Sequence, residues 1–66
     1  MNEPTNQLKH AIRIYALHYV EEHNGAFEYE IKNSIDQHLD EWIKEAVDSN
    51  LKAGFIQRRN SLLIMT

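Results

Sequence analysis

Two glycines and one proline are the strong helix breakers of this chain of 66 residues, and they divide it into few segments. Pro4 precedes a long run without breakers that ends at Asn24-Gly25, and Gly54 closes a second long stretch. Asn and Gly tolerate the left-handed conformation that often ends a helix, so both sites are typical of helix C-termini. A chain of this length has room for one small core, and we expect a single domain over residues 1–66.

The first helix is predicted over about residues 5–23, where no breaker interrupts the chain. Thr5 or Asn6 is expected to cap its first turn, because a short side-chain oxygen can accept a hydrogen bond from an unpaired backbone amide. Apolar side chains spaced three and four residues apart predict the face that packs against the core. Its members are Leu8, Ala11, Ile12, Tyr15 and Tyr19.

Ile14 and Leu17 do not fit that face of the first helix. On a helical wheel they point roughly the opposite way, among His10, Arg13 and Glu21. A helix with apolar side chains over so much of its circumference must be covered by the rest of its own chain or by another subunit. We therefore predict that Ile14 and Leu17 are dimer contacts in a homodimer.

A short second helix is predicted over about residues 28–35. Phe27, Ile31 and Ile35 recur every four residues along it, and polar side chains fill its other faces. This spacing is typical of one apolar stripe on a helix that packs against the core.

The third helix is predicted over about residues 39–53, with Gly54 at its C-terminus. Asp36 or His38 could cap its first turn, because both lie in the polar break that precedes it. Helical spacing again gives an inward set, with Trp42 at its margin. The members of this set are Leu39, Ile43, Ala46, Val47 and Leu51.

After Gly54 the helical period stops. Residues 55–65 predict a hairpin of two short strands around the polar turn Arg59-Asn60-Ser61. The expected fold class is therefore mainly α with a small β-hairpin.

Composition and spacing argue against several classes of function. The chain has no cysteine, which excludes disulfides and thiolate metal sites. None of its four histidines has another histidine at the spacing of a helical metal site; His18 with Glu22, or His38 with Glu41, supplies two ligands at most. It also lacks a glycine-rich phosphate loop and a nucleophile with an adjacent base. We expect no metal, no cofactor and no enzyme activity.

The chain has no apolar run near the length of about 20 residues that a membrane-spanning helix needs. Its N-terminus also lacks the basic and apolar blocks of a signal peptide. We therefore expect a cytoplasmic protein without a membrane partner.

The order of these elements resembles that of winged helix-turn-helix domains. The most specific stretch, VDSNLKAGFIQRR at residues 47–59, is similar to the end of that family's recognition helix and its first wing strand. Residues 27–31, FEYEI, look like the start of its second helix. The resemblance implies a three-helix winged helix-turn-helix fold that binds duplex DNA as a transcriptional regulator, with the third helix in the major groove and the hairpin on the backbone. The DNA-binding candidates that it implies are Gln37, His38, Lys44, Arg58, Arg59 and Asn60.

Charge opposes this interpretation at the third helix, and the net charge of the chain is -3. Binding to duplex DNA depends largely on Lys and Arg side chains that displace counterions. The helix instead carries four acidic residues against two lysines. The acidic residues are Asp40, Glu41, Glu45 and Asp48.

Two alternatives to DNA binding therefore stay open. One is a winged-helix protein-interaction module, an adaptor or a phage-type modulator, whose acidic third helix meets a basic surface on a protein partner or mimics nucleic acid. The other is a small structural subunit of a larger assembly. In either case Arg58 and Arg59 would be a solvated hairpin turn whose charges keep the strand edge from pairing with other chains.

Overall fold

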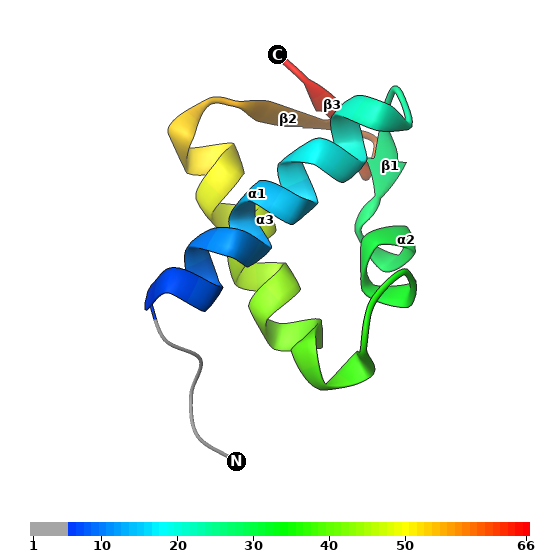
Figure 1. The fold of residues 1–66 in the computed structure, drawn as a ribbon. Helices are drawn as coiled ribbons and strands as arrows, with labels where there is room; N and C mark the ends of the chain where they lie inside the picture. Colours follow the sequence, from blue (N-terminus) through cyan, green and yellow to red (C-terminus); the bar gives the residue numbers. More distant parts are fainter. Residues whose placement is uncertain (1–5) are drawn as a thin grey trace.

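The computed structural model describes residues 6–66, in which helices and strands follow one another in the order shown in Figure 1. The elements are α1 (Asn6–Glu22), β1 (Ala26–Phe27), α2 (Glu28–Asn33), the short 3-10 helix η1 (Gln37–Leu39), α3 (Asp40–Ala53), β2 (Ile56–Arg59) and β3 (Leu62–Met65). The predicted class, mainly α with a small β-hairpin, is confirmed, and a third strand joins the hairpin.

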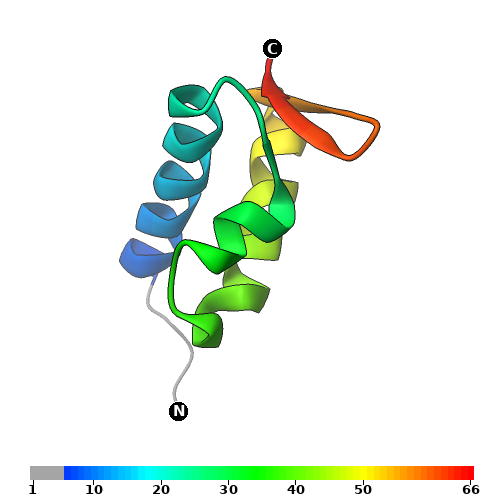
Figure 2. The same cartoon turned by 90° about the vertical axis from the view of Figure 1, so that its right-hand side faces the viewer.

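The core lies where α1 crosses α3 and where the sheet covers one end of both helices (Figures 1 and 2). α1 packs mainly against α3. Ala16 and Ala46 are both buried, and side chains this small let two helices approach closely. Apart from η1, every element contributes to the core. Its buried apolar residues are Ile12, Ala16, Val20, Ala26, Ile31, Ile43, Ala46, Val47, Ile56 and Leu63.

The predicted core face of α1 is partly wrong. Ile12 is buried, but Leu8 is 43% exposed and Ala11 is exposed, whereas Ala16 and Val20 lie in the core. The buried line follows a spacing of four residues along the side of α1 that contacts α3. Apolar side chains occur on several faces of this helix, so its sequence alone places the centre of the buried face poorly.

Tyr15 and Tyr19 lie at the margin of the core rather than inside it. Both are half-buried against it, with ring centroids 6.3 Å apart. The Tyr15 hydroxyl forms a hydrogen bond with the Ser34 hydroxyl, which itself donates to the carbonyl of Ile31 at 2.7 Å. A tyrosine hydroxyl needs such a partner or water, and this keeps the ring at the edge of an apolar core.

The predicted inward set of α3 is largely confirmed. Ile43, Ala46 and Val47 are buried, while Leu39, Leu51 and the marginal Trp42 are half-buried against the core. Sequence reasoning missed one member, because it is polar. Asn50 is only 4% exposed, and its side-chain amide donates a hydrogen bond of 3.0 Å to the backbone carbonyl of Arg13 on α1.

Both predicted glycine positions end a helix. After α1, Asn24 and Gly25 have φ angles of 53° and 112°, and Gly54 after α3 has φ 81°. Asp36 is a cap, as predicted: its Oδ1 accepts from the amide of His38 at 3.0 Å, although the helix that it caps is η1. α3 begins at Asp40, one residue after its predicted start, because Leu39 belongs to η1. Of the two caps predicted for the first helix, Thr5 lies outside the described residues and Asn6 is the first residue of α1.

α2 ends at Asn33, two residues before its predicted end. The carbonyl of Ile31, in the last turn, accepts from the Ser34 hydroxyl at 2.7 Å and from the Ser34 amide at 3.2 Å. Ile35 still packs against the core, but from the turn that follows the helix.

The sheet is antiparallel, with β3 between β1 and β2. The predicted polar turn is confirmed, since Asn60 and Ser61 join β2 to β3 with φ angles of 49° and 75°. Positive φ at both turn residues is typical of hairpin turns whose twist matches the strands. β1 was not predicted, because two residues are too few to show a strand period. It pairs Ala26 with Leu63 and Phe27 with Leu62.

We predict that Asn50→Ala lowers the free energy of unfolding by about 1–3 kcal/mol, because it removes a buried hydrogen bond and leaves a small cavity. Asn33→Ala is the matched control, since Asn33 is exposed at the end of α2. Urea denaturation followed by circular dichroism measures both variants. Equal unfolding midpoints for Asn50→Ala and the wild type would contradict the assigned role of Asn50.

We predict different costs for alanine at the two glycines. At Gly54 an added Cβ meets no atom within 4 Å, so Gly54→Ala should cost only the conformational penalty of about 1 kcal/mol. At Gly25 the Cβ would lie 3.2 Å from Ile64 Cγ2 and 3.4 Å from the Leu63 carbonyl oxygen. Gly25→Ala should therefore cost about 2 kcal/mol or more. Thermal unfolding of both variants checks this order, which the reverse result would refute.

Candidate interaction surface

The surface of α3 that faces away from the core is the first part of the site. Its exposed side chains are Glu41, Lys44, Glu45, Asp48 and Lys52. In residues 6–66 the ion pairs are two, and both are formed by Glu28, so the three carboxylates of this surface are not paired within the described chain. Three unpaired negative side chains next to two lysines form a surface that favours a positive partner.

Asp40 departs from the expectation for this helix. It is one of the four acidic residues of α3, but unlike Glu41, Glu45 and Asp48 it is half-buried. One of its carboxylate oxygens, Oδ1, is buried and has no hydrogen-bond partner among the described residues. We therefore leave it out of the exposed surface.

All six DNA-binding candidates are exposed, but they do not form one cluster. Gln37 and His38 precede α3, whereas the hairpin residues Arg58, Arg59 and Asn60 follow it. Figure 2 shows η1 and the hairpin near opposite ends of α3. A helix of 14 residues is about 21 Å long. Between its ends, Lys44 is the sixth candidate, and it is flanked along the chain by Glu45 and, three residues earlier, Glu41.

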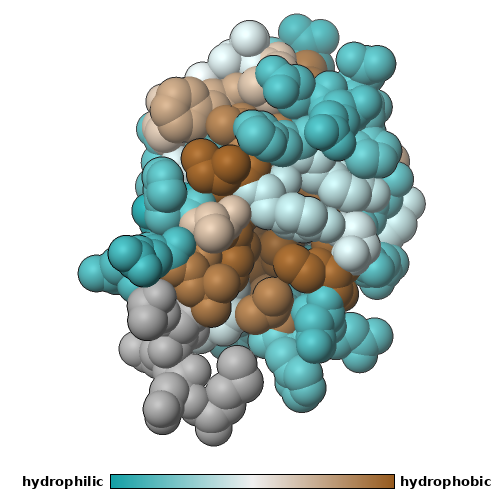
Figure 3. Space-filling view, viewed as in Figure 1, coloured by the Kyte–Doolittle hydropathy of each residue, from teal (hydrophilic) through white to brown (hydrophobic). Residues whose placement is uncertain are grey.

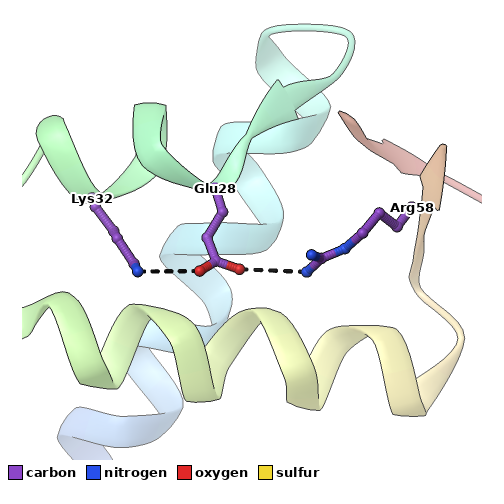
Figure 4. A network of polar contacts seen from close by, with 3 residues as sticks. All are labelled: Glu28, Lys32 and Arg58. Atoms are coloured by element: carbon purple, nitrogen blue, oxygen red, sulfur yellow. Dashed lines mark hydrogen bonds and ion pairs between the residues drawn. The ribbon is translucent and has the colours of Figure 1, made fainter. Parts of the chain in front are cut away.

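One of the two hairpin arginines is already engaged. The Arg58 guanidinium lies 3.4 Å from Glu28 Oε1, and Lys32 Nζ lies 3.1 Å from Oε2 of the same carboxylate (Figure 4). Glu28 and Lys32 belong to α2, so the three side chains connect α2 to β2. The spacing of four residues between Glu28 and Lys32 could have indicated their pair from the sequence. The contact between Arg58 and Glu28 depends on how the hairpin packs, so the sequence alone could not have indicated it.

A groove between α1 and α3 is lined by two further basic side chains, which from the sequence could have joined the hairpin arginines on one face. It has a volume of about 350 Å³ and is lined by Lys9 and Arg13 of α1. On α3 its lining includes Trp42, Lys52 and the acidic residues Glu45 and Asp48. Lys9 Nζ lies 5.0 Å from the centroid of the Trp42 ring, within the range of a cation–π contact.

The basic side chains of the fold thus fall into separate groups. Lys9 and Arg13 line the groove between α1 and α3, whereas Lys32 and Arg58 flank Glu28 between α2 and β2. Because neighbouring phosphates must be neutralised together, cations in separate groups are a weak site for a nucleic-acid backbone.

The two residues predicted as dimer contacts differ in their exposure. Ile14 is 39% exposed, as expected for a residue that points away from the core. Leu17 is half-buried and packs against the core of its own chain, so its expected orientation is partly wrong.

In residues 6–66 no three His, Asp or Glu side chains lie close enough together to hold a metal ion. Over the same residues, no helix combines the length and the apolar character needed to cross a membrane. Comparison of the chain with protein-family models, curated proteins and solved structures finds no match.

We predict that Glu28→Gln lowers the free energy of unfolding by about 0.2–1 kcal/mol at low salt and by less at high salt, because partly exposed ion pairs are weak and screened. Glu41→Gln makes the same change on α3, where the structure gives no ion pair, and should leave the midpoint unchanged. Urea denaturation at two salt concentrations measures both. A loss that is equal for both variants would contradict the network in Figure 4.

Proposed function

We propose that this chain is a winged-helix protein-interaction module and that α3 binds a basic surface on a partner protein. The observation that carries the proposal is the set of three exposed carboxylates on α3, Glu41, Glu45 and Asp48, which form no ion pair within the described chain. Complementary charge accelerates association and selects among partners, so such a surface would recognise clustered Lys or Arg side chains.

The winged-helix part of the proposal rests on the order and pairing of the elements. A long helix, a short helix, a tight turn, a third helix, a glycine and a terminal hairpin follow one another, as the sequence resemblance implies. The hairpin is held to the body of the fold by β1, which pairs with β3, and by Arg58, which reaches Glu28. These contacts support a wing with a fixed position relative to α3.

The charges around α3 favour a protein partner over duplex DNA. A recognition helix in the major groove lies between two phosphate backbones. In that position Glu41, Glu45 and Asp48 would approach negative charge. Lys44 and Lys52 on α3, with Lys9 and Arg13 across the groove, would offset part of that repulsion. Arg58 would in addition have to leave Glu28 or bind a phosphate with part of its charge already used.

DNA binding remains the second candidate, because one observation favours it. Arg59 and Asn60 lie exposed at the hairpin turn, and Arg59 forms no ion pair among the described residues. An arginine at such a turn can reach a phosphate or a narrow minor groove. In that case the hairpin would supply most of the affinity, and a dimer would be needed to read enough base pairs.

Binding to a fluorescent duplex, followed by anisotropy at low and at physiological salt, separates the two candidates. We expect no saturable binding to the duplex by the wild type at low salt. Tight binding that weakens steeply with salt and is lost in Arg58→Ala/Arg59→Ala would overturn the proposal in favour of DNA binding.

Affinity capture from extracts of the cells that make the protein tests the partner directly. We predict that the wild type and Glu22→Lys retain a basic protein that Glu45→Lys binds about 10-fold more weakly, because the reversed charge would repel the partner's cations. Glu22 is a matched control, since it is an exposed helical glutamate outside α3. Equal retention by Glu45→Lys and Glu22→Lys would contradict the role assigned to α3.

A further inference from the structure

Four side chains form a narrow stripe on the outer face of α1. His10, Ile14, Leu17 and Glu21 are separated by four, three and four residues, and at 100° per residue they fall within about 60° of one another. His10, Ile14 and Glu21 are exposed and Leu17 is half-buried. We call these four residues the α1 seam. Spacing of this kind is typical of helices that pack along one another.

The outer face of α1 is open in the structure. α1 lies in front of the other elements in Figure 1 and at one side of them in Figure 2, and none of the described elements covers it. Figure 3 shows apolar side chains on this side of the molecule in several patches, with more hydrophilic side chains between them. Ile14 is 39% exposed there, although an isoleucine side chain gains free energy when it is removed from water.

The order of the side chains makes the α1 seam complementary to itself. We infer that α1 pairs with α1 of a second copy in antiparallel orientation, with Ile14 against the second copy's Leu17 and His10 against the second copy's Glu21. Both contacts form in a single antiparallel register, because His10 precedes Ile14 by four residues and Glu21 follows Leu17 by four residues. The two-fold symmetry of such a dimer repeats each contact, which gives an apolar centre with a polar pair at each end.

Charge selects the antiparallel orientation over the parallel one. In a parallel pair, Glu21 would face Glu21 of the second copy and His10 would face its own equivalent, so like groups would meet. In the antiparallel pair each carboxylate meets an imidazole. Like charges that face each other disfavour a complex and opposite polarity fixes its register, so the seam itself specifies a second copy as its occupant.

The hydrogen bond between Arg13 and His10 leaves His10 with a donor for this contact. Arg13 Nη2 lies 3.4 Å from His10 Nδ1. A guanidinium can only donate, so Nδ1 is the acceptor and neutral His10 carries its proton on Nε2. That proton is free to be donated to the second copy's Glu21 carboxylate, whose side chain is exposed.

The inference does not rest on the proposed function, because it uses α1 and not α3. Part of the Leu17 side chain already packs against the core of its own chain, so the contact area between two copies is small. Interfaces below about 1,200 Å² are usually weak, and we expect a dissociation constant on the order of 100 μM.

Sedimentation equilibrium from about 10 μM to about 1 mM tests the dimer across the expected dissociation constant. We expect reversible dimerisation by the wild type and a monomer for Ile14→Glu. Ile14 is exposed, so circular dichroism should show that this variant keeps its fold. A wild type that stays monomeric over the whole range, or a folded Ile14→Glu that still dimerises, overturns the inference.

A charge exchange tests the register. His10→Glu and Glu21→Lys should each weaken the dimer about 10-fold, because each change alters two symmetric pairs. Combining both changes in one chain restores opposite charges across the interface and should recover the affinity of the wild type. Glu22→Lys, with the same charge change beside the seam, should have little effect. If the combined variant is as weak as the single variants, the antiparallel register is wrong.

Discussion

The contact between α1 and α3 depends on one buried amide. Asn50 sits among apolar side chains near the end of α3 and donates to the backbone carbonyl of Arg13, and its own backbone carbonyl accepts from the amide of Phe55 at 3.1 Å. A buried amide is unfavourable unless its hydrogen bonds are made, so α1 and α3 have one position in which this group is satisfied. The crossing of the two helices, the turn at Gly54 and the start of the hairpin all meet at this residue.

The position of α1 on α3 determines where the charged side chains lie on the surface. With α1 fixed on one side of α3, Lys9 and Arg13 line the groove between the helices together with Glu45 and Asp48, and the side chains of Glu41, Glu45 and Asp48 stay exposed. The hairpin follows directly from the end of α3, which brings Arg58 to Glu28 rather than to the α3 surface. The acidic excess of the whole chain is small, but the fold concentrates unpaired negative charge on one helix.

The sequence predicted the elements well where a local rule applies. Gly54 and Asn24-Gly25 end helices because their φ angles are positive, and Asn60-Ser61 forms the hairpin turn for the same reason. Longer-range features were out of reach. The two residues of β1 form a strand only because β3 lies beside them. Asn50 can be buried because its amide donates to the carbonyl of Arg13, which lies 37 positions earlier in the chain. The pairing of Arg58 with Glu28 likewise joins residues 30 positions apart.

The proposed role of α3 is tested most directly by nuclear magnetic resonance titration of the isotope-labelled chain with a lysine-rich peptide and, separately, with a DNA duplex. If α3 is a surface for basic partners, the peptide should shift the backbone amide signals of Glu41, Glu45 and Asp48, while the duplex should leave the signals of α3 unchanged. The opposite result, in which the duplex shifts the signals of α3 and of Arg59 and the peptide shifts neither, would contradict the account.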